Sequence, residues 1–393
     1  MLTFRPLSPA SLQRDRTEPA PLDGHDGELG LEHVELQERV RAVHAELVLW
    51  KISECTRAGD LELELVELDV DELPEEIFDL QWLQVIDLSR NLFGQGVLED
   101  LKELRGLRAI NLDYNLLTGP LPAVIAELPP QLEELSFDFN VVTEIPEAAA
   151  ALSELRWLSA RRNLIAGIST ACFSSWAQLE HLDLRDNKFK VVPHEISACS
   201  ALQTLLLSNN GIEELPDTLG FCTALVVLQV QKNSLRALPE SLAKCTELEE
   251  LDASFNRLAE YPPALCVYHV RMKRLMLSEN KLAVLPPEVR CMEGLEVLGL
   301  ANNSIKALPE EVGALAALRE VYCNGNPMTS LPSSVAGWGA LEEAGFKGCK
   351  LKGLPGCGRG ARSLAVGMGD SPSSPSQGRG GRVEVVPCAR CRA

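Results

Sequence analysis

Asparagine recurs along most of this chain at a nearly constant interval, and this periodicity restricts the possible folds more than any other feature. The recurring residues are Asn91, Asn115, Asn140, Asn163, Asn187, Asn210, Asn233, Asn256, Asn280, Asn303 and Asn326, each 23 to 25 residues after the one before. Each ends a frame Leu-x-x-Leu-x-Leu-x-x-Asn, of which Leu202, Leu205, Leu207 and Asn210 form a complete copy. Such a period is typical of a solenoid of stacked repeats.

The leucines of the frame predict a short strand in every repeat. Their alternation with variable residues turns one face of the strand inward, and successive repeats then stack their strands in parallel. The chain must turn after each strand, and an inward asparagine side chain would bond the backbone groups that this turn leaves unpaired. We therefore interpret the asparagines as structural. Degenerate copies at Leu63 and at Cys349, which replaces asparagine, bring the expected number to about thirteen repeats.

The second half of each repeat contains proline at a fixed place. Proline stands six residues after the asparagine position at Pro74, Pro146, Pro193, Pro216, Pro239, Pro262, Pro286, Pro309, Pro332 and Pro355. Because proline pre-sets φ for the first turn of a helix and needs no donor there, short helices or 3₁₀ turns are expected on the convex side. Three repeats depart from this frame, near Gly96, Leu121 and Ile168, and extra residues near 129–130 and 266–270 should bulge there.

The two ends of the chain differ from the repeats. Residues 1–27 are polar and contain proline, which predicts disorder. Residues 28–60 are predicted to form a helix that caps the open end of the array, residues 61–355. Its apolar stripe is Leu29, Leu36, Val40, Val43, Leu47 and Trp50. Residues 356–393 are rich in glycine, serine and arginine, which predicts a disordered tail; six arginines against Asp370 and Glu384 give it a net charge of +4.

Most of the twelve cysteines fit the repeats. Cys199, Cys222 and Cys245 are 23 residues apart and occupy the point where another repeat has Leu152. We interpret them as small core residues rather than as metal ligands or redox groups. In the tail, Cys388 and Cys391 form a Cys-x-x-Cys pair, which is half of a zinc site at best and is read as a free thiol pair.

Charge and motifs exclude several classes of function. A net charge of −19 opposes binding to nucleic acid, which relies on lysine and arginine at the phosphates. The sequence has no long apolar run for a membrane span and no apolar leader at its start, so a cytoplasmic location is expected. The six histidines are scattered, and no nucleophile-elbow, zinc-protease or phosphate-loop motif occurs. We therefore expect neither an enzyme nor a bound cofactor or metal.

The variable strand positions suggest where a partner could bind. Large aromatic and basic residues gather in the N-terminal half of the array: Tyr114, Phe139, Trp157, Arg161, Arg162, His181 and Arg185. Tyrosine, tryptophan and arginine dominate binding hot spots. Acidic neighbours such as Asp138 and Asp183 leave open the alternative of a salt-bridged, solvated face. A looser second group consists of Phe255, Arg274, Met276 and Tyr322.

The repeat unit resembles that of the Ras-group leucine-rich-repeat proteins, which include animal Ras-pathway scaffolds and plant intracellular relatives. The segments LLLSNNGIEELPDTL (205–219) and LMLSENKLAVLPPEV (275–289) carry the resemblance, which covers about residues 61–355. It implies an α/β leucine-rich-repeat solenoid, a horseshoe with a concave parallel sheet, short convex helices or 3₁₀ turns and an N-terminal capping helix. It also implies a cytosolic scaffold that binds a small GTPase, a phosphatase or a kinase.

Two functional hypotheses follow. The first is an intracellular scaffold or adaptor in signalling, a monomer when free, that binds a folded protein through its concave face. The second is a structural subunit of a larger cytoskeletal or axonemal assembly, which would use the convex side or the ends of the array.

Overall fold

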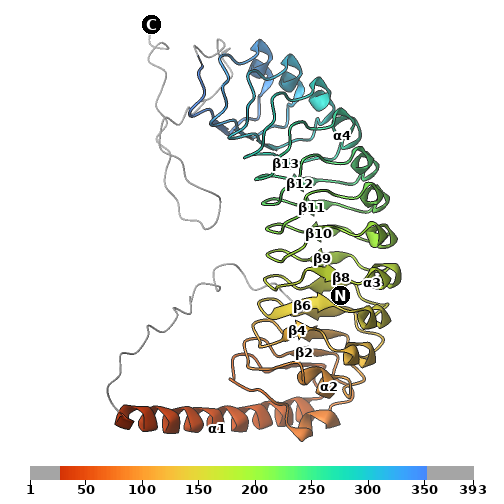
Figure 1. Ribbon diagram of the computed structural model, residues 1–393, viewed down its shortest axis with the longest axis vertical. Coiled ribbons are helices and arrows are strands. Elements are labelled where there is room, and N and C mark those ends of the chain that lie inside the picture. Colours follow the sequence, from red (N-terminus) through yellow and green to blue (C-terminus); the bar gives the residue numbers. More distant parts are fainter. Residues whose placement is uncertain (1–26, 352–393) are drawn as a thin grey trace.

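The protein is a curved solenoid, shown in Figure 1, whose concave face is one continuous parallel sheet. The computed structural model describes residues 27–351, with side chains described from residue 39 onward. The sheet has thirteen strands, as the repeat count predicted. They are β1 Glu62–Glu64, β2 Val85–Asp87, β3 Ala109–Asn111, β5 Glu134–Ser136, β7 Trp157–Ser159, β9 His181–Asp183, β10 Thr204–Leu206, β11 Val227–Gln229, β12 Glu250–Asp252, β13 Arg274–Met276, β14 Val297–Gly299, β15 Glu320–Tyr322 and β16 Glu343–Gly345.

Strand register places equivalent residues of successive repeats side by side. Leu158 of β7 lies opposite Leu182 of β9, which lies opposite Leu205 of β10. All three are buried, because every strand turns its central residue into the core. The core is mostly leucine, and Cys199, Cys222 and Cys245 are fully buried within it, as predicted. Burial raises the pKa of the Cys199 thiol to about 12, so it stays protonated and acts as a packing group.

The convex side carries one short helix between each two successive strands of the concave sheet (Figure 1). Three are α-helical: α2 Val97–Leu101, α3 Thr170–Ser175 and α4 Pro263–Tyr268. The rest are 3₁₀ helices: η2 Glu75–Asp79, η3 Ala123–Glu127, η4 Glu147–Ala151, η5 His194–Ala198, η6 Asp217–Phe221, η7 Glu240–Lys244, η8 Pro287–Cys291, η9 Glu310–Ala314 and η10 Ser333–Gly337. The repeats near Gly96 and Ile168, which lack the usual proline, and the longer repeat at 266–270 are the α-helical ones.

The recurring prolines precede these helices rather than forming their first turn as expected. Pro216, for example, has φ −70° and ψ 144°, an extended conformation, and caps η6. Its carbonyl accepts a 3.0 Å hydrogen bond from the Leu219 N–H. The proline is therefore the last extended residue before the 3₁₀ turn, where its ring restricts φ and its carbonyl still serves the helix.

A second parallel sheet, absent from the sequence predictions, joins three repeats next to the concave sheet. It consists of β4 Thr118–Pro120, β6 Val141–Ile145 and β8 Gly167–Ile168, in the order β4-β6-β8. It covers two of the three repeats that depart from the usual frame, those near Leu121 and Ile168. There the chain after the asparagine runs extended and pairs with the next repeat.

Helix α1, Gly27–Ala58, lies across the N-terminal end of the array (Figure 1). It caps the first repeat, but through a different face from the predicted one. Val48, Ile52 and Cys55 are buried against the core, while Val43 and Trp50 of the predicted stripe are 62% and 57% exposed. Of the described stripe residues, Leu47 alone packs against the core, so Val48, Ile52 and Cys55 supply most of the contact. The expected disordered segments and the tail cysteines lie outside the described residues.

Candidate functional site

Each repeat presents its variable residues to the outside at fixed points. In the repeat of β7, Trp157, Ser159 and Arg161 alternate with the buried Leu158 and Ala160 and so face the concave side. The residue before the asparagine then takes a left-handed conformation, with φ between 53° and 59°. The non-glycine residues in this position are Arg90, Tyr114, Phe139, Arg162, Asp186, Asn209, Lys232, Phe255, Glu279 and Asn302.

These left-handed residues form a continuous row along one edge of the concave sheet. The Arg90 guanidinium lies 4.6 Å from the centre of the Tyr114 ring. The Tyr114 and Phe139 rings stack with centroids 4.0 Å apart and an interplanar angle of 13°. The Arg162 guanidinium lies 5.0 Å from the Phe139 ring centre, and its Nε is 3.7 Å from an Asp186 carboxylate oxygen. Two stacked aromatic rings are thus flanked by Arg90 and Arg162, and the Arg161 guanidinium lies 5.7 Å from the Phe139 ring centre.

A row of apolar side chains runs beside this one. Leu116, Val141 and Leu164 are 54%, 45% and 43% exposed, and each lies two residues after a member of the first row. Backbone hydrogen bonds hold them in adjacent repeats, because the Val141 N–H donates to the Leu117 carbonyl and the Leu164 N–H to the Val142 carbonyl, both at 2.8 Å.

We call the combined surface the edge patch. It consists of Arg90, Tyr114, Phe139, Arg162, Leu116, Val141 and Leu164. The next repeat places Asp186 and Lys188 at the two positions, so the apolar character ends there. Sequence reasoning missed the apolar row, although a signal existed, since the residue after the asparagine is apolar in four successive repeats at 92, 116, 141 and 164.

Trp157 and His181 form a separate stack at the other end of the strands. They are register partners on β7 and β9, with ring centroids 3.5 Å apart and an interplanar angle of 4°. Burial lowers the pKa of His181 to about 4, so the imidazole is neutral near pH 7 and the stack is between uncharged rings. Trp157 lies four residues before Arg161 on one strand, a separation of about 13 Å. The extended strand thus sets the tryptophan apart from Arg161, whose guanidinium lies 5.7 Å from the centre of the Phe139 ring instead.

Arg161 and Arg185 lie between the two aromatic groups and are engaged by carboxylates. The Arg185 Nε donates to both Asp183 oxygens at 2.9 Å, and Asp183 is itself buried. The Arg161 Nε donates to Asp186 at 3.2 Å. These pairs make the middle of the face mixed in sign, as the neighbouring acidic residues indicated.

Two aspartates of the same face share a crowded environment. Asp113 accepts hydrogen bonds from the Ser136 hydroxyl and the Asp138 N–H, and Asp138 accepts from the Ser159 hydroxyl and the Arg161 N–H. Burial, with repulsion between the carboxylates, raises the pKa of both Asp113 and Asp138. The pair therefore holds a proton to higher pH than ordinary aspartates do, which lowers the negative charge beside the edge patch.

The second predicted group is not a cluster. Phe255 lies in the turn after β12, Arg274 and Met276 on β13, and Tyr322 on β15, beyond the intervening β14. The Tyr322 hydroxyl donates to its neighbour Glu320 at 3.0 Å.

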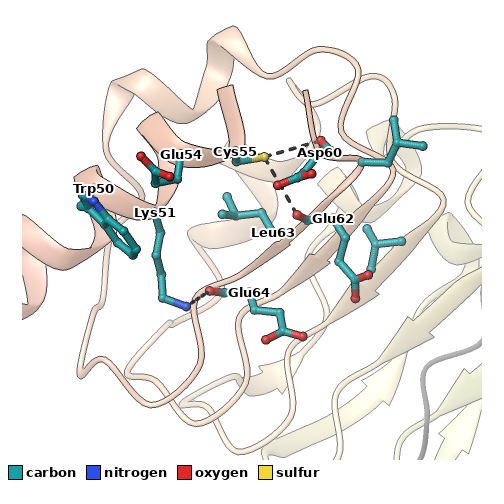
Figure 2. A pocket seen from close by; sticks show the side chains of 10 residues that line it. Trp50, Lys51, Glu54, Cys55, Asp60, Glu62, Leu63 and Glu64 are labelled. Atoms are coloured by element: carbon teal, nitrogen blue, oxygen red, sulfur yellow. Dashed lines mark hydrogen bonds between the residues drawn. The ribbon is translucent and has the colours of Figure 1, made fainter. Parts of the chain in front are cut away.

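Figure 2 shows a hollow of about 600 Å³ where α1 meets the first strand. Its lining residues are Trp50, Lys51, Glu54, Cys55, Asp60, Leu61, Glu62, Leu63, Glu64 and Val85. The Lys51 ammonium donates to the Glu64 carbonyl at 2.7 Å, and the Cys55 thiol reaches the Asp60 carbonyl at 3.5 Å. These bonds join helix to strand, and we read the hollow as a structural junction.

Comparison with known proteins places the chain in a class. Residues 160–260 match the family model described as a leucine-rich repeat region. A protein phosphatase 1 regulatory inhibitor subunit, the PPP1R7 homolog of Arabidopsis thaliana, is 43% identical over 70 residues, 17% of this chain and 21% of that protein. The human volume-regulated anion channel subunit LRRC8A is 29% identical over 137 residues, 33% of this chain and 16% of that protein. The chain thus spans about a fifth or less of the length of these relatives.

Solved structures show the same architecture. A leucine-rich-repeat protein of Leptospira interrogans has a TM-score of 0.62 and 28% identity, with 72% of this chain and 77% of that chain covered. A plant peptide hormone receptor, solved with its peptide RGF2, has a TM-score of 0.61 and 26% identity, with 72% of this chain and 46% of that chain covered. The chain therefore has the leucine-rich-repeat solenoid fold, and residues 160–260 match the repeat family itself.

Two further observations bear on its chemistry. In the part of the chain that the structure describes, no set of three or more histidine, cysteine, aspartate or glutamate side chains is arranged to hold a metal ion. Within the same residues, no helix has the length and apolar character needed to cross a membrane.

Proposed function

We propose that the protein is a cytoplasmic, non-enzymatic adaptor of signalling whose edge patch and concave face bind a folded protein. The edge patch carries this proposal. Its centre is a stacked tyrosine and phenylalanine, its rim contains Arg90 and Arg162, and apolar side chains extend it over adjacent repeats. Interface hot spots have this composition, with aromatic and arginine side chains at the centre.

A phosphatase catalytic subunit is the first partner to test. The Arabidopsis relative is named as a regulatory inhibitor subunit of protein phosphatase 1, and the resemblance to Ras-group repeats also suggests small GTPases and kinases. The Trp157–His181 stack offers a second contact on the same concave face, because Trp157 is 44% exposed. A partner that spans the strands would contact both groups.

The test compares three variants for binding to purified protein phosphatase 1 catalytic subunit and for proteins captured from a lysate. Tyr114→Asn/Phe139→Asn removes the aromatic centre, and asparagine suits the left-handed backbone because Asn209 and Asn302 occupy the equivalent position. Trp157→Ala/Arg161→Glu removes the tryptophan of the Trp157–His181 stack and reverses the charge of Arg161, which lies between the two aromatic groups. Phe221→Ala on the convex η6 is the control, since its ring is 56% exposed.

We expect the edge variant to weaken binding by about thirtyfold or more, the loss of a hot spot of about 2 kcal/mol. The Phe221 control should bind like the wild type. Failure of the wild type to bind the phosphatase would reject that partner. An unchanged set of captured proteins for both concave variants would reject the surface itself.

A structural subunit of a larger assembly is the second candidate, favoured by the exposed apolar residues of α1 at the end of the array. It predicts co-purification at fixed stoichiometry that the edge and concave variants leave intact.

A further inference from the structure

Helix α1 carries an apolar stripe that the repeats do not cover. Val40, Val43 and Trp50 are 40%, 62% and 57% exposed, and Leu47, between them, is partly buried at the edge of the core. Their spacings of three, four and three residues match the seam of a two-stranded coiled coil. The face of α1 that does pack on the first repeat is a different one, with Val48, Ile52 and Cys55.

The geometry of α1 leaves this stripe available to another helix. Its main contacts with the body are at β1 and η2, and His44 also lies 3.6 Å from Asp69. The N-terminal half extends beyond the repeats on the concave side (Figure 1). A helix in water is marginally stable unless its apolar face is packed, so an uncovered extension of this length calls for a partner.

We propose that the stripe pairs with the same stripe of a second copy of this chain, as an antiparallel two-helix coiled coil. Val40 of each chain then lies opposite Val43 of the other. The two-fold axis passes between residues 41 and 42, close to the middle of Gly27–Ala58. A two-fold contact of this kind is self-complementary, so one surface serves both chains.

The charges beside the stripe fit this arrangement. Arg39 and Glu46 are exposed and flank it on the side away from the body. In the antiparallel register, Arg39 of each chain faces Glu46 of the other, which gives two reciprocal ion pairs. A parallel pair would instead set Arg39 against His44, and Glu46 against Lys51, whose ammonium already donates to the Glu64 carbonyl of its own chain. The antiparallel pair also keeps the two solenoids at opposite ends of the paired helices.

This proposal differs from the monomer that the sequence analysis expects. The oligomeric state is tested by sedimentation of the full chain over about a hundredfold range of concentration. We expect a concentration-dependent mass of twice one chain. Val43→Glu should raise the dissociation constant by about a hundredfold or more, because it puts a charge in the seam. Leu49→Glu is the matched control, 41% exposed on another face of the same helix, and should leave dimerisation unchanged.

The charged pair tests the register and remains informative if Val43→Glu disturbs folding. Arg39→Glu and Glu46→Arg should each weaken the dimer by about fivefold, and the double swap should restore it. A wild type that sediments as a monomer throughout overturns the proposal, even if α1 captures a different protein. A dimer insensitive to Val43→Glu, or one that the double swap does not restore, overturns it as well.

Discussion

At the scale of single residues, one side chain joins neighbouring repeats. Asn187 accepts a 3.0 Å hydrogen bond from the Ile165 N–H of the previous repeat. Its amide nitrogen donates to the Ala160 carbonyl at 2.8 Å and to the Leu184 carbonyl at 3.1 Å. The role read from the sequence is confirmed, since the side chain pairs backbone groups that the turn would leave unpaired. In the last repeat that the structure describes, Cys349 occupies the asparagine position and makes one weaker bond, in which its thiol donates to the Cys323 carbonyl at 3.2 Å.

Asn187→Ala should lower the free energy of unfolding by about 2–5 kcal/mol, because each buried backbone group left without a partner costs about 1–3 kcal/mol. Urea denaturation followed by circular dichroism measures it. Asn209→Gly is the control. It removes an exposed amide that bonds only Asp186 and keeps the left-handed backbone, and should change stability by less than about 0.5 kcal/mol. Equal losses in the two variants would contradict the structural role.

The pH dependence of stability should report the Asp138 carboxyl. Burial and the neighbouring Asp113 carboxylate raise its folded pKa above the unfolded value near 4, so the folded state holds the proton more tightly between the two pKa values. Stability therefore falls as pH rises through this window and stops falling above it. Above about pH 7.5, well beyond the ordinary histidine pKa near 6.5, His181 is neutral in both states, which leaves Asp138 as the main contributor from this face. The slope should not exceed about 1.4 kcal/mol per pH unit.

Asp138→Asn should remove most of that slope, because asparagine imitates the protonated acid and can still accept from Ser159 and Arg161. Denaturation at a series of pH values measures it. Asp186→Asn is the matched control, since the hydrogen bonds and cations around Asp186 lower its pKa and keep it ionised throughout this range. A slope that survives in Asp138→Asn would show that another group causes it.

At the scale of elements, the repeat pattern predicted strands and helices, but contact with neighbours decided their details. The recurring proline predicted a helical turn in each repeat. The position of Pro216 just before η6 follows from the hydrogen bond that its carbonyl accepts from the Leu219 N–H. For α1, periodicity identified an apolar stripe but could not say what would cover it. The face that packs contains only Val48, Ile52 and Cys55, too short a pattern to outweigh the longer stripe. The sequence pattern did not predict the second sheet, because β4, β6 and β8 pair only when their repeats are stacked on one another.

At the scale of the whole molecule, the solenoid is held together by contacts between adjacent repeats. The register of distant strands follows from the pairing of each strand with its neighbour, as when Leu158 pairs with Leu182 and Leu182 with Leu205. In such an array, stability is close to a sum of repeat and interface contributions, so damage at one end stays near that end. The cap is the place to test this, because α1 contacts only the first repeat elements.

Ile52→Ala should cost about 2–5 kcal/mol locally, since Ile52 is buried under the cap. Hydrogen exchange should show faster exchange in α1, β1 and β2 and unchanged protection in β14 to β16. Leu49→Ala, on an exposed face of the same helix, should leave the pattern intact. Loss of protection along the entire array would show that the repeats unfold as one unit.

The residue pattern alone predicts the solenoid, its thirteen strands and the buried cysteines, because a fixed period repeats the same local packing problem and therefore the same solution. It also points to Tyr114, Phe139 and Arg162 of the edge patch, since residue type is readable without coordinates, but not to Arg90 or the apolar row. How these residues group depends on contacts in the folded chain. Strand extension separates Trp157 from Arg161, and left-handed turns stack Tyr114 on Phe139 beside Leu116 and Val141. Only the tertiary structure likewise decided which face of α1 is covered, because burial depends on what another part of the chain presents.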